Sequence, residues 1–154
     1  MSYSSINFLR RPMTAQVSET LIYHGKDLMM FSNPLDPYLR ATGIHFVSPH
    51  TANWRGYKGT WEIKGTEETH QGLYLVKLKA HRSYEDLVGL TELFPGFPDG
   101  VFAHWFSGEI RLPQGSLLEY VHGGYASQYE YDLFLEIKKG LVVSQRAVHN
   151  KAGS

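Results

Sequence analysis

The sequence contains no cysteine, and this absence excludes several kinds of chemistry together. Without a thiol there is no disulfide bond, no thiolate nucleophile and no cysteine-ligated zinc site. The absence also fits a reducing compartment, so we expect a cytoplasmic protein. Stability has to come from a packed core instead, and a chain of 154 residues is long enough to form one.

Long apolar runs and an excess of charge are missing as well. No run approaches the ~20 residues that span a bilayer, and residues 1–13 lack an apolar core of signal-peptide length. We therefore expect no membrane partner. Fifteen basic and fifteen acidic residues give a formal net charge of zero. Because non-specific nucleic-acid binding normally needs a basic surface, nucleic acid is not an expected partner either.

Recognisable catalytic motifs are also absent. There is no glycine-rich phosphate loop, no dinucleotide fingerprint and no nucleophile elbow. The eight histidines include no pair at the helical spacing of a zinc protease. We therefore predict neither a cofactor nor a metal site.

The feature that the sequence has in excess is aromatic side chains. Ten Tyr, eight Phe and three Trp make up 14% of the residues. Aromatic residues favour β-strands, and they are also common on binding surfaces because each offers a large rigid face. A β-sheet core accounts for most of them.

Short alternating segments separated by turn residues predict a single β-rich domain over residues 16–149. Residues 1–15 are expected to form a flexible extension and residues 150–154 a flexible tail. The predicted fold is mainly β (α+β): a strongly bent antiparallel sheet, barrel or sandwich of about eight short strands with one short helix. The candidate strands cover residues 17–23, 28–31, 45–48, 57–63, 73–78, 101–106, 109–112, 116–121, 131–137 and 141–148.

Turn and helix signals complete this prediction. Glycines predict tight hairpins at residues 24–25 and 138–140, and residues 113–115 are expected to turn between two paired strands. The apolar spacing over residues 83–93 allows a short helix, while residues 34–39 allow at most one helical turn. The strand at 73–78 is apolar on both faces, which predicts a central position in the sheet.

The first segment rich in functional residue types covers residues 53–63. Strand alternation places Tyr57 on the same face as Trp61. In one interpretation Trp61 packs in the core, and Arg55 stacks on Trp54 or pairs with a carboxylate. In the other, Trp54, Arg55 and Tyr57 belong to a binding surface.

The second segment covers residues 104–130. If the strands at 109–112 and 116–121 pair, five polar side chains converge near one end of the sheet: His104, Glu109, Arg111, Glu119 and His122. A Glu beside a His is the minimum set for general acid–base catalysis, so His104, Glu109, Glu119 and His122 are the catalytic candidates if the protein is an enzyme. An Arg–Glu pair that fixes strand register is the alternative. The binding candidates of this segment are Trp105, Arg111, Tyr125 and Tyr129.

Several short motifs together resemble a known group of proteins. They are WRGY and TWEI within residues 54–63, LYL at 73–75, WFSGEIR at 105–111 and LEYVH at 118–122. The set resembles a family of small, stand-alone bacterial proteins of unknown function, over about residues 17–143. The resemblance implies a bacterial or mobile-element origin and carries over no catalytic residue.

Two hypotheses of function follow. The first is a non-enzymatic protein that binds a protein partner through an aromatic and arginine surface, for example as an immunity protein that neutralises a toxin, or as a protein that acts in conflict between hosts and phages. The alternative is a pocket for a small molecule, which sequesters a ligand or acts as a small hydrolase with the His, Glu and Arg cluster. The sequence predicts no oligomeric state.

Overall fold

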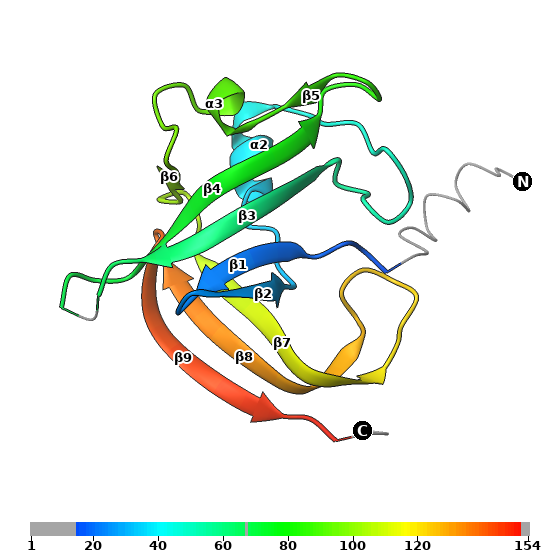
Figure 1. Ribbon diagram of the computed structural model, residues 1–154, viewed down its shortest axis with the longest axis vertical. Helices are drawn as coiled ribbons and strands as arrows, with labels where there is room; N and C mark the ends of the chain where they lie inside the picture. Colours follow the sequence, from blue (N-terminus) through cyan, green and yellow to red (C-terminus); the bar gives the residue numbers. More distant parts are fainter. Residues whose placement is uncertain (1–14, 67, 152–154) are drawn as a thin grey trace, which may run out of the picture.

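The computed structural model describes residues 15–66 and 68–151, and these form one strongly bent, mixed β-sheet with two short helices (Figure 1). The predicted mainly β fold is therefore confirmed. The predicted extension and tail lie largely outside the described residues. Neither helix in the described ranges has the length and apolar character needed to cross a bilayer.

The sheet follows the order β2-β1-β3-β4-β9-β8-β7, with β5 and β6 paired to β4. The strands are β1 (Glu19–Tyr23), β2 (Lys26–Met30), β3 (Tyr57–Lys64), β4 (Gly72–His81), β5 (Leu87–Val88), β6 (Val101–Phe102), β7 (Gly108–Glu119), β8 (Gln128–Lys138) and β9 (Leu141–His149). Every pair is antiparallel except β1 with β3. The connection from β2 to β3 carries helix α2 (Asp36–Thr42) and crosses back, so β3 runs parallel to β1.

Both predicted hairpins are confirmed. His24 and Gly25 between β1 and β2 have φ angles of 51° and 75°, and Lys139 and Gly140 between β8 and β9 have φ angles of 47° and 85°. Two successive residues at positive φ are typical of the type I′ turn, whose twist matches that of the flanking strands. The central position of β4 is confirmed too, because β3 lies on one side and β5, β6 and β9 on the other.

The hairpin predicted around residues 113–115 is wrong. Residues on both sides of it belong to the single strand β7, which pairs with β8 throughout. Pro113 and Gln114 pair in regular register, and the register shifts between Gln114 and Leu117, where Gly115 takes a φ angle of 84°, so the chain forms a bulge there and not a turn. Pro113 is tolerated because β7 lies at one end of the sheet.

Four other predictions need correction. Residues 45–48 form no strand and are attached by one backbone hydrogen bond, from Val47 N–H to the His81 carbonyl (2.7 Å). The helix predicted at 83–93 shrinks to the single turn α3 (Leu90–Leu93), because β5 pairs with the end of β4. The strand predicted at 101–106 shortens to β6, and α2 has seven residues and thus more than one turn.

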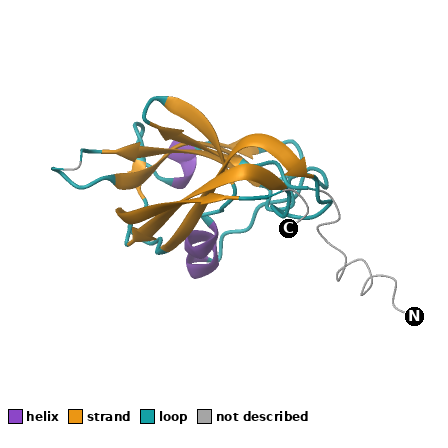
Figure 2. Ribbon diagram, turned by 90° about the horizontal axis from the view of Figure 1, so that it is seen from below, coloured by secondary structure: helices purple, strands orange, loops and turns teal. Residues whose placement is uncertain are grey.

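Seen from below, the sheet curves back over itself and encloses the core (Figure 2). Tyr57 and Trp61 of β3 are fully buried there. The two end strands β2 and β7 approach each other without pairing, so the sheet does not close into a barrel. The Phe31 N–H donates to the Arg111 carbonyl (2.8 Å), and the Ser32 hydroxyl donates to the Glu109 carbonyl (3.3 Å).

Candidate functional site

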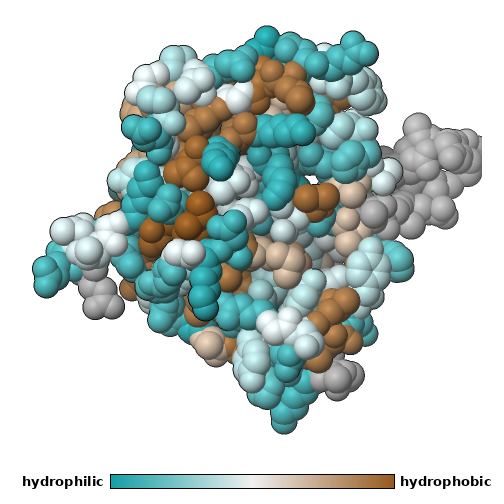
Figure 3. Space-filling view, in the orientation of Figure 1, coloured by the Kyte–Doolittle hydropathy of each residue, from teal (hydrophilic) through white to brown (hydrophobic). Residues whose placement is uncertain are grey.

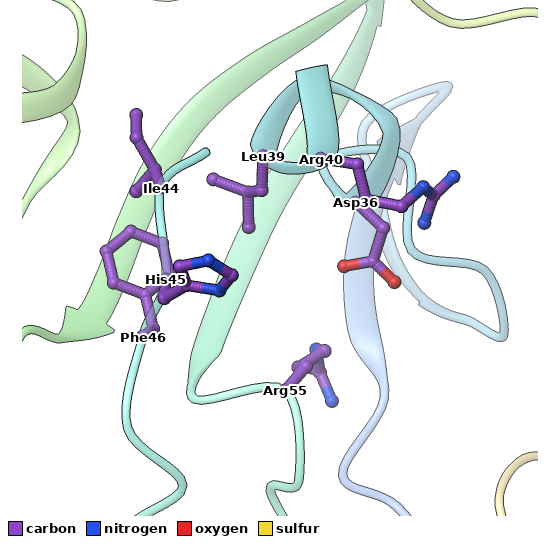
Figure 4. Close-up of a pocket in the computed structure, with 7 residues that line it drawn as sticks. All are labelled: Asp36, Leu39, Arg40, Ile44, His45, Phe46 and Arg55. Carbon is purple, nitrogen blue, oxygen red and sulfur yellow. The ribbon is translucent and has the colours of Figure 1, made fainter. Parts of the chain in front are cut away.

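A small open pocket lies between helix α2, the segment that follows it, and Arg55 before β3 (Figure 4). Its volume is about 190 Å³. It is lined by Asp36, Leu39, Arg40, Ile44, His45, Phe46 and Arg55. Two cationic side chains, one carboxylate and one imidazole therefore share the pocket with three apolar side chains.

Helix α2 and its termination place one wall of this pocket. Pro37 follows Asp36 in the first turn, where a proline costs no hydrogen bond. Gly43 ends the helix in a left-handed conformation (φ 73°), and its N–H donates to the Leu39 carbonyl (2.9 Å). The chain therefore leaves the helix at once, and Ile44, His45 and Phe46 after it line the same pocket (Figure 4).

The Asp36 carboxylate is oriented by a hydroxyl from the core. The Tyr57 hydroxyl donates to Asp36 Oδ1 at 2.7 Å. Burial, together with the carboxylates of Glu19 and Asp36, raises the pKa of Tyr57, so this hydroxyl stays protonated and keeps donating. Among the described residues Tyr57 is the one hydrogen-bond partner of the Asp36 carboxylate, whose second oxygen is left for another donor.

The opposite wall is formed by Arg55, which is held in a buried ion pair with Glu19. Arg55 Nη2 donates to Glu19 Oε2 at 2.7 Å, and Arg55 Nη1 donates to the Val17 carbonyl at 2.8 Å. The side chains of Arg55 and Glu19 are 7% and 0% exposed. Glu19 also accepts hydrogen bonds from the Gly59 N–H (2.7 Å) and from Trp61 Nε1 (3.0 Å).

Glu19 and Arg55 each stabilise the ionised form of the other. Desolvation raises the pKa of Glu19, but three donors point at its two oxygens and favour the ionised form. Desolvation opposes the charge on Arg55, yet the Glu19 carboxylate together with Tyr125 and Tyr57 outweighs it and raises the pKa of Arg55. Each side chain of the pair therefore favours the charge of the other inside the core.

One donor of Arg55 remains unused. Its Nε is buried and has no hydrogen-bond partner among the described residues. An unpaired buried donor costs about 1–3 kcal/mol, and Arg55 lines the pocket.

His45 completes the polar lining. Its side chain is exposed, and Figure 4 shows its imidazole and the Asp36 carboxylate pointing into the space above Arg55. Arg40 lies at the outer edge and is exposed. The pocket can thus offer a hydrogen-bond acceptor, the Asp36 carboxylate, and donors from Arg55 and His45 to one small molecule.

The residues predicted in the first segment take three different positions. Trp54 is 42% exposed, and its backbone N–H donates to Gln16 Oε1 (2.6 Å). Arg55 pairs with a carboxylate, as one of the two interpretations expected. Tyr57 is fully buried, so its side chain is not part of a surface that a protein partner can touch.

The binding candidates of the second segment are engaged inside the molecule. Arg111 donates from all three guanidinium nitrogens: to Asp132 (2.7 Å) and to the carbonyls of Tyr125 (2.7 Å) and Ser127 (2.9 Å). The Tyr125 ring stacks on Phe31, and the Tyr129 ring meets Phe31 edge-on. These contacts attach the segment between β7 and β8 to the sheet.

Trp105 likewise has intramolecular partners. Its Nε1 donates to the Pro34 carbonyl (2.8 Å), and its ring stacks on Phe94 with centroids 5.7 Å apart. The ring also contacts Tyr38 of α2. Trp105 therefore fixes the position of the helix that carries the pocket.

The predicted cluster of His104, Glu109, Arg111, Glu119 and His122 does not form, because its basis was the hairpin that proved to be a single strand. Glu109 and Glu119 lie near opposite ends of β7, roughly 30 Å apart at the usual rise per residue. Glu109 pairs with Arg146 on the surface (3.0 Å).

The two histidines of that cluster rest against aromatic rings. His104 meets Trp105 edge-on, and His122 meets Tyr120 edge-on. In the part of the chain that the structure describes, no three His, Asp or Glu side chains gather closely enough to hold a metal ion.

Sequence reasoning selected Arg55 but missed Asp36, His45 and Glu19. One signal was present for Glu19. Strand alternation puts it on the same face as Leu21 and Tyr23, both buried, and a carboxylate on a core face requires a buried partner.

In comparisons with known proteins, no family model, no curated protein and no solved structure matches this chain. The resemblance to small bacterial proteins stays a prediction.

Proposed function

We propose that this protein binds a small amino acid, or a molecule of the same zwitterionic type, in the pocket between α2 and Arg55. The observation that supports the proposal is a pocket lined both by Arg55, whose Nε has no hydrogen-bond partner among the described residues, and by the Asp36 carboxylate, which has one oxygen unused. This is the small-molecule hypothesis, with a different set of residues from those that the sequence suggested.

The charges of the lining match a ligand that carries both signs. A ligand carboxylate is attracted by Arg55, Arg40 and His45, and it satisfies the Nε–H that has no other acceptor. A ligand ammonium group donates to the unused oxygen of Asp36. A simple anion would leave the Asp36 oxygen unpaired and would be repelled by its charge.

The size and the apolar wall restrict the ligand further. A volume of about 190 Å³ is below the ~300–1,000 Å³ of typical sites for drug-sized ligands. Leu39, Ile44 and Phe46 form the apolar part of the lining. A short aliphatic side chain, such as that of leucine, fits both restrictions.

The test is a titration calorimetry series on the full chain. The twenty standard amino acids are screened first by thermal shift. Leucine is then compared with 4-methylpentanoate, which lacks the amino group, and with 3-methylbutylamine, which lacks the carboxylate. We expect leucine to bind at least about tenfold more tightly than either analogue, because each analogue loses one charge-assisted hydrogen bond.

Variants assign the two ends of the ligand. Asp36→Asn should abolish the preference for leucine over 4-methylpentanoate, and His45→Gln should weaken the binding of both ligands. Asp27→Asn makes the same chemical change at an exposed aspartate of β2 and should alter neither the preference nor the affinities. The proposal is wrong if no amino acid stabilises the protein, or if Asp36→Asn leaves the preference unchanged.

A further inference from the structure

The strand β9 has an unpaired edge over most of its length. It pairs with β8 along its full length, but it pairs with β4 through Leu141 alone. Beyond that point β4 is covered by β6 and β5 and diverges from β9, as Figure 1 shows. No other described strand pairs with β9 on this side, although the Tyr23 hydroxyl of β1 donates to the Gln145 side chain (3.2 Å).

Backbone alternation determines which groups face the open edge. The Asn150 N–H donates to the Glu130 carbonyl (2.8 Å), so even-numbered residues at this end of β9 bond to β8. The odd-numbered residues Gln145, Ala147 and His149 therefore direct their N–H and C=O groups away from β8. These groups form a ready template for another strand.

Between residues 144 and 149 this edge lacks the features that usually block such pairing. Proteins protect open edges with prolines, bulges or inward-pointing charges. The bulge of β9 lies before this stretch, at Val143, and residues 144–149 contain no proline and one formally charged side chain, Arg146. That side chain is held elsewhere, because it lies over the Phe134 ring and contacts Glu109 (3.0 Å).

We propose that the open edge of β9 pairs antiparallel with β9 of a second copy of this chain, around a two-fold axis at Ala147. The formal net charge of zero means that two copies do not repel each other through their total charge. The three residues with outward backbone groups, Gln145, Ala147 and His149, are symmetric about Ala147. In this register each of them meets an outward-facing residue of the second copy.

Neighbouring registers are less favourable for identifiable reasons. An axis at Arg146 places two arginines directly opposite each other, which is destabilising. An axis at Gln145 brings His149 of the second copy opposite Leu141, where β4 already occupies the edge at Gly72. An axis at Ala147 keeps the second strand clear of β4 and puts the smallest side chain of this segment at the centre.

The pairing rests on main-chain hydrogen bonds and not on an apolar patch. In Figure 3 apolar side chains lie mainly over β4 and toward α3, while the surface over β9 is mostly polar. Stable interfaces usually bury about 1,200–2,000 Å², which one short ladder does not reach. We therefore expect a weak, concentration-dependent dimer.

Variants that place opposite charges at Ala147, on the proposed two-fold axis, test the proposal. Sedimentation velocity from about 10 μM to 2 mM should show the mass rising from 17.5 kDa toward twice that value. Ala147→Glu alone and Ala147→Lys alone should each stay monomeric, because like charges meet at the axis. An equimolar mixture of the two should restore the dimer, since each pair then brings a Glu opposite a Lys.

A cysteine at the same position tests the register. The chain has no native cysteine, so Ala147→Cys introduces a single thiol. Opposed residues of a hydrogen-bonded pair lie about 5.5 Å apart between Cα atoms, within the 4.4–6.8 Å range of disulfides. Mild oxidation should therefore link Ala147→Cys as a dimer and leave Ala41→Cys, at an exposed alanine of α2, mostly unlinked.

Either of two results overturns the proposal. One is a protein that stays monomeric up to about 2 mM, which would leave a strand of a different protein as the candidate for this edge. The other is a dimer that the single Ala147→Glu variant leaves intact, because such a dimer uses another surface. Ala41→Glu serves as the control for the added charge and should not change the dimer.

Discussion

Replacement of Glu19 by Gln is the sharpest test of how this core is held together. The carboxylate receives donors on both oxygens: Trp61 Nε1 on Oε1, and Arg55 Nη2 together with the Gly59 N–H on Oε2. An amide has one oxygen and one NH₂ group. In either orientation of the amide a donor therefore faces a donor, and Arg55 also loses its counter-charge.

The expected cost follows from the burial of both partners. Glu19 is 0% and Arg55 is 7% exposed at the side chain, so water cannot replace the lost contacts. Breaking a buried pair of this kind costs about 3–5 kcal/mol. Small domains have a total free energy of unfolding of about 5–15 kcal/mol. Glu19→Gln should thus remove a large share of the stability.

A double-mutant cycle measures how much of this cost comes from the interaction between Glu19 and Arg55. Arg55→Met removes the charge and keeps much of the side-chain length, and by itself leaves Glu19 buried without its cation. The double variant contains no uncompensated charge, so we expect it to lose at least about 1 kcal/mol less than the sum of the single variants. Urea unfolding followed by tryptophan fluorescence measures all four proteins, because Trp61 lies beside the pair.

The control is the same change at a surface ion pair. Glu92 lies 3.6 Å from Arg82, with both side chains more than half exposed, and Glu92→Gln should change the free energy of unfolding by less than about 0.5 kcal/mol. A cost below about 1 kcal/mol for Glu19→Gln would refute the reasoning. Additivity of the two single variants within about 0.5 kcal/mol would refute the coupling between them.

Two further predictions concern β7 and β8. Arg111→Lys keeps a charge for Asp132 but cannot reach the Tyr125 and Ser127 carbonyls together, so amide hydrogen exchange over residues 120–127 should accelerate while β8 stays protected. The Ser116 N–H donates to Glu130 (2.6 Å) and lowers the pKa of Glu130 from 4.5. The stability from this contact should be present above pH 4.5 and lost as the pH falls through the lowered pKa. A ¹³C NMR titration of the Glu130 carboxyl measures that pKa, and Glu130→Gln should flatten this part of the acid unfolding curve.

Most of the sheet could be predicted because its signals are local. The alternation in β3 and the glycine turns of the two hairpins depend on a few neighbouring residues. The bulge in β7 could not be predicted in this way. Pro113, Gln114 and Gly115 are equally typical of a turn, and only the pairing with the distant strand β8 shows that the chain continues straight.

The pocket depends on contacts that are even more distant in sequence. Asp36, His45 and Arg55 come from a helix, a loop and the start of a strand, and no spacing in the sequence connects them. The cluster predicted from residues 104–122 failed for the complementary reason. Its members were close in sequence, and a single extended strand separates two of them by its full length.

The ion pair and the pocket are linked through the geometry of one guanidinium group. Two nitrogens of Arg55 are fixed by Glu19 and Val17, and the third has no partner. A well-packed apolar pair often equals or exceeds a buried ion pair in stability, so stability alone does not explain this arrangement. If the pair serves to aim the free Nε at a ligand, the double variant of the cycle should recover part of its stability and yet fail to bind leucine. If the double variant binds leucine as the natural chain does, the ion pair is a feature of the core alone.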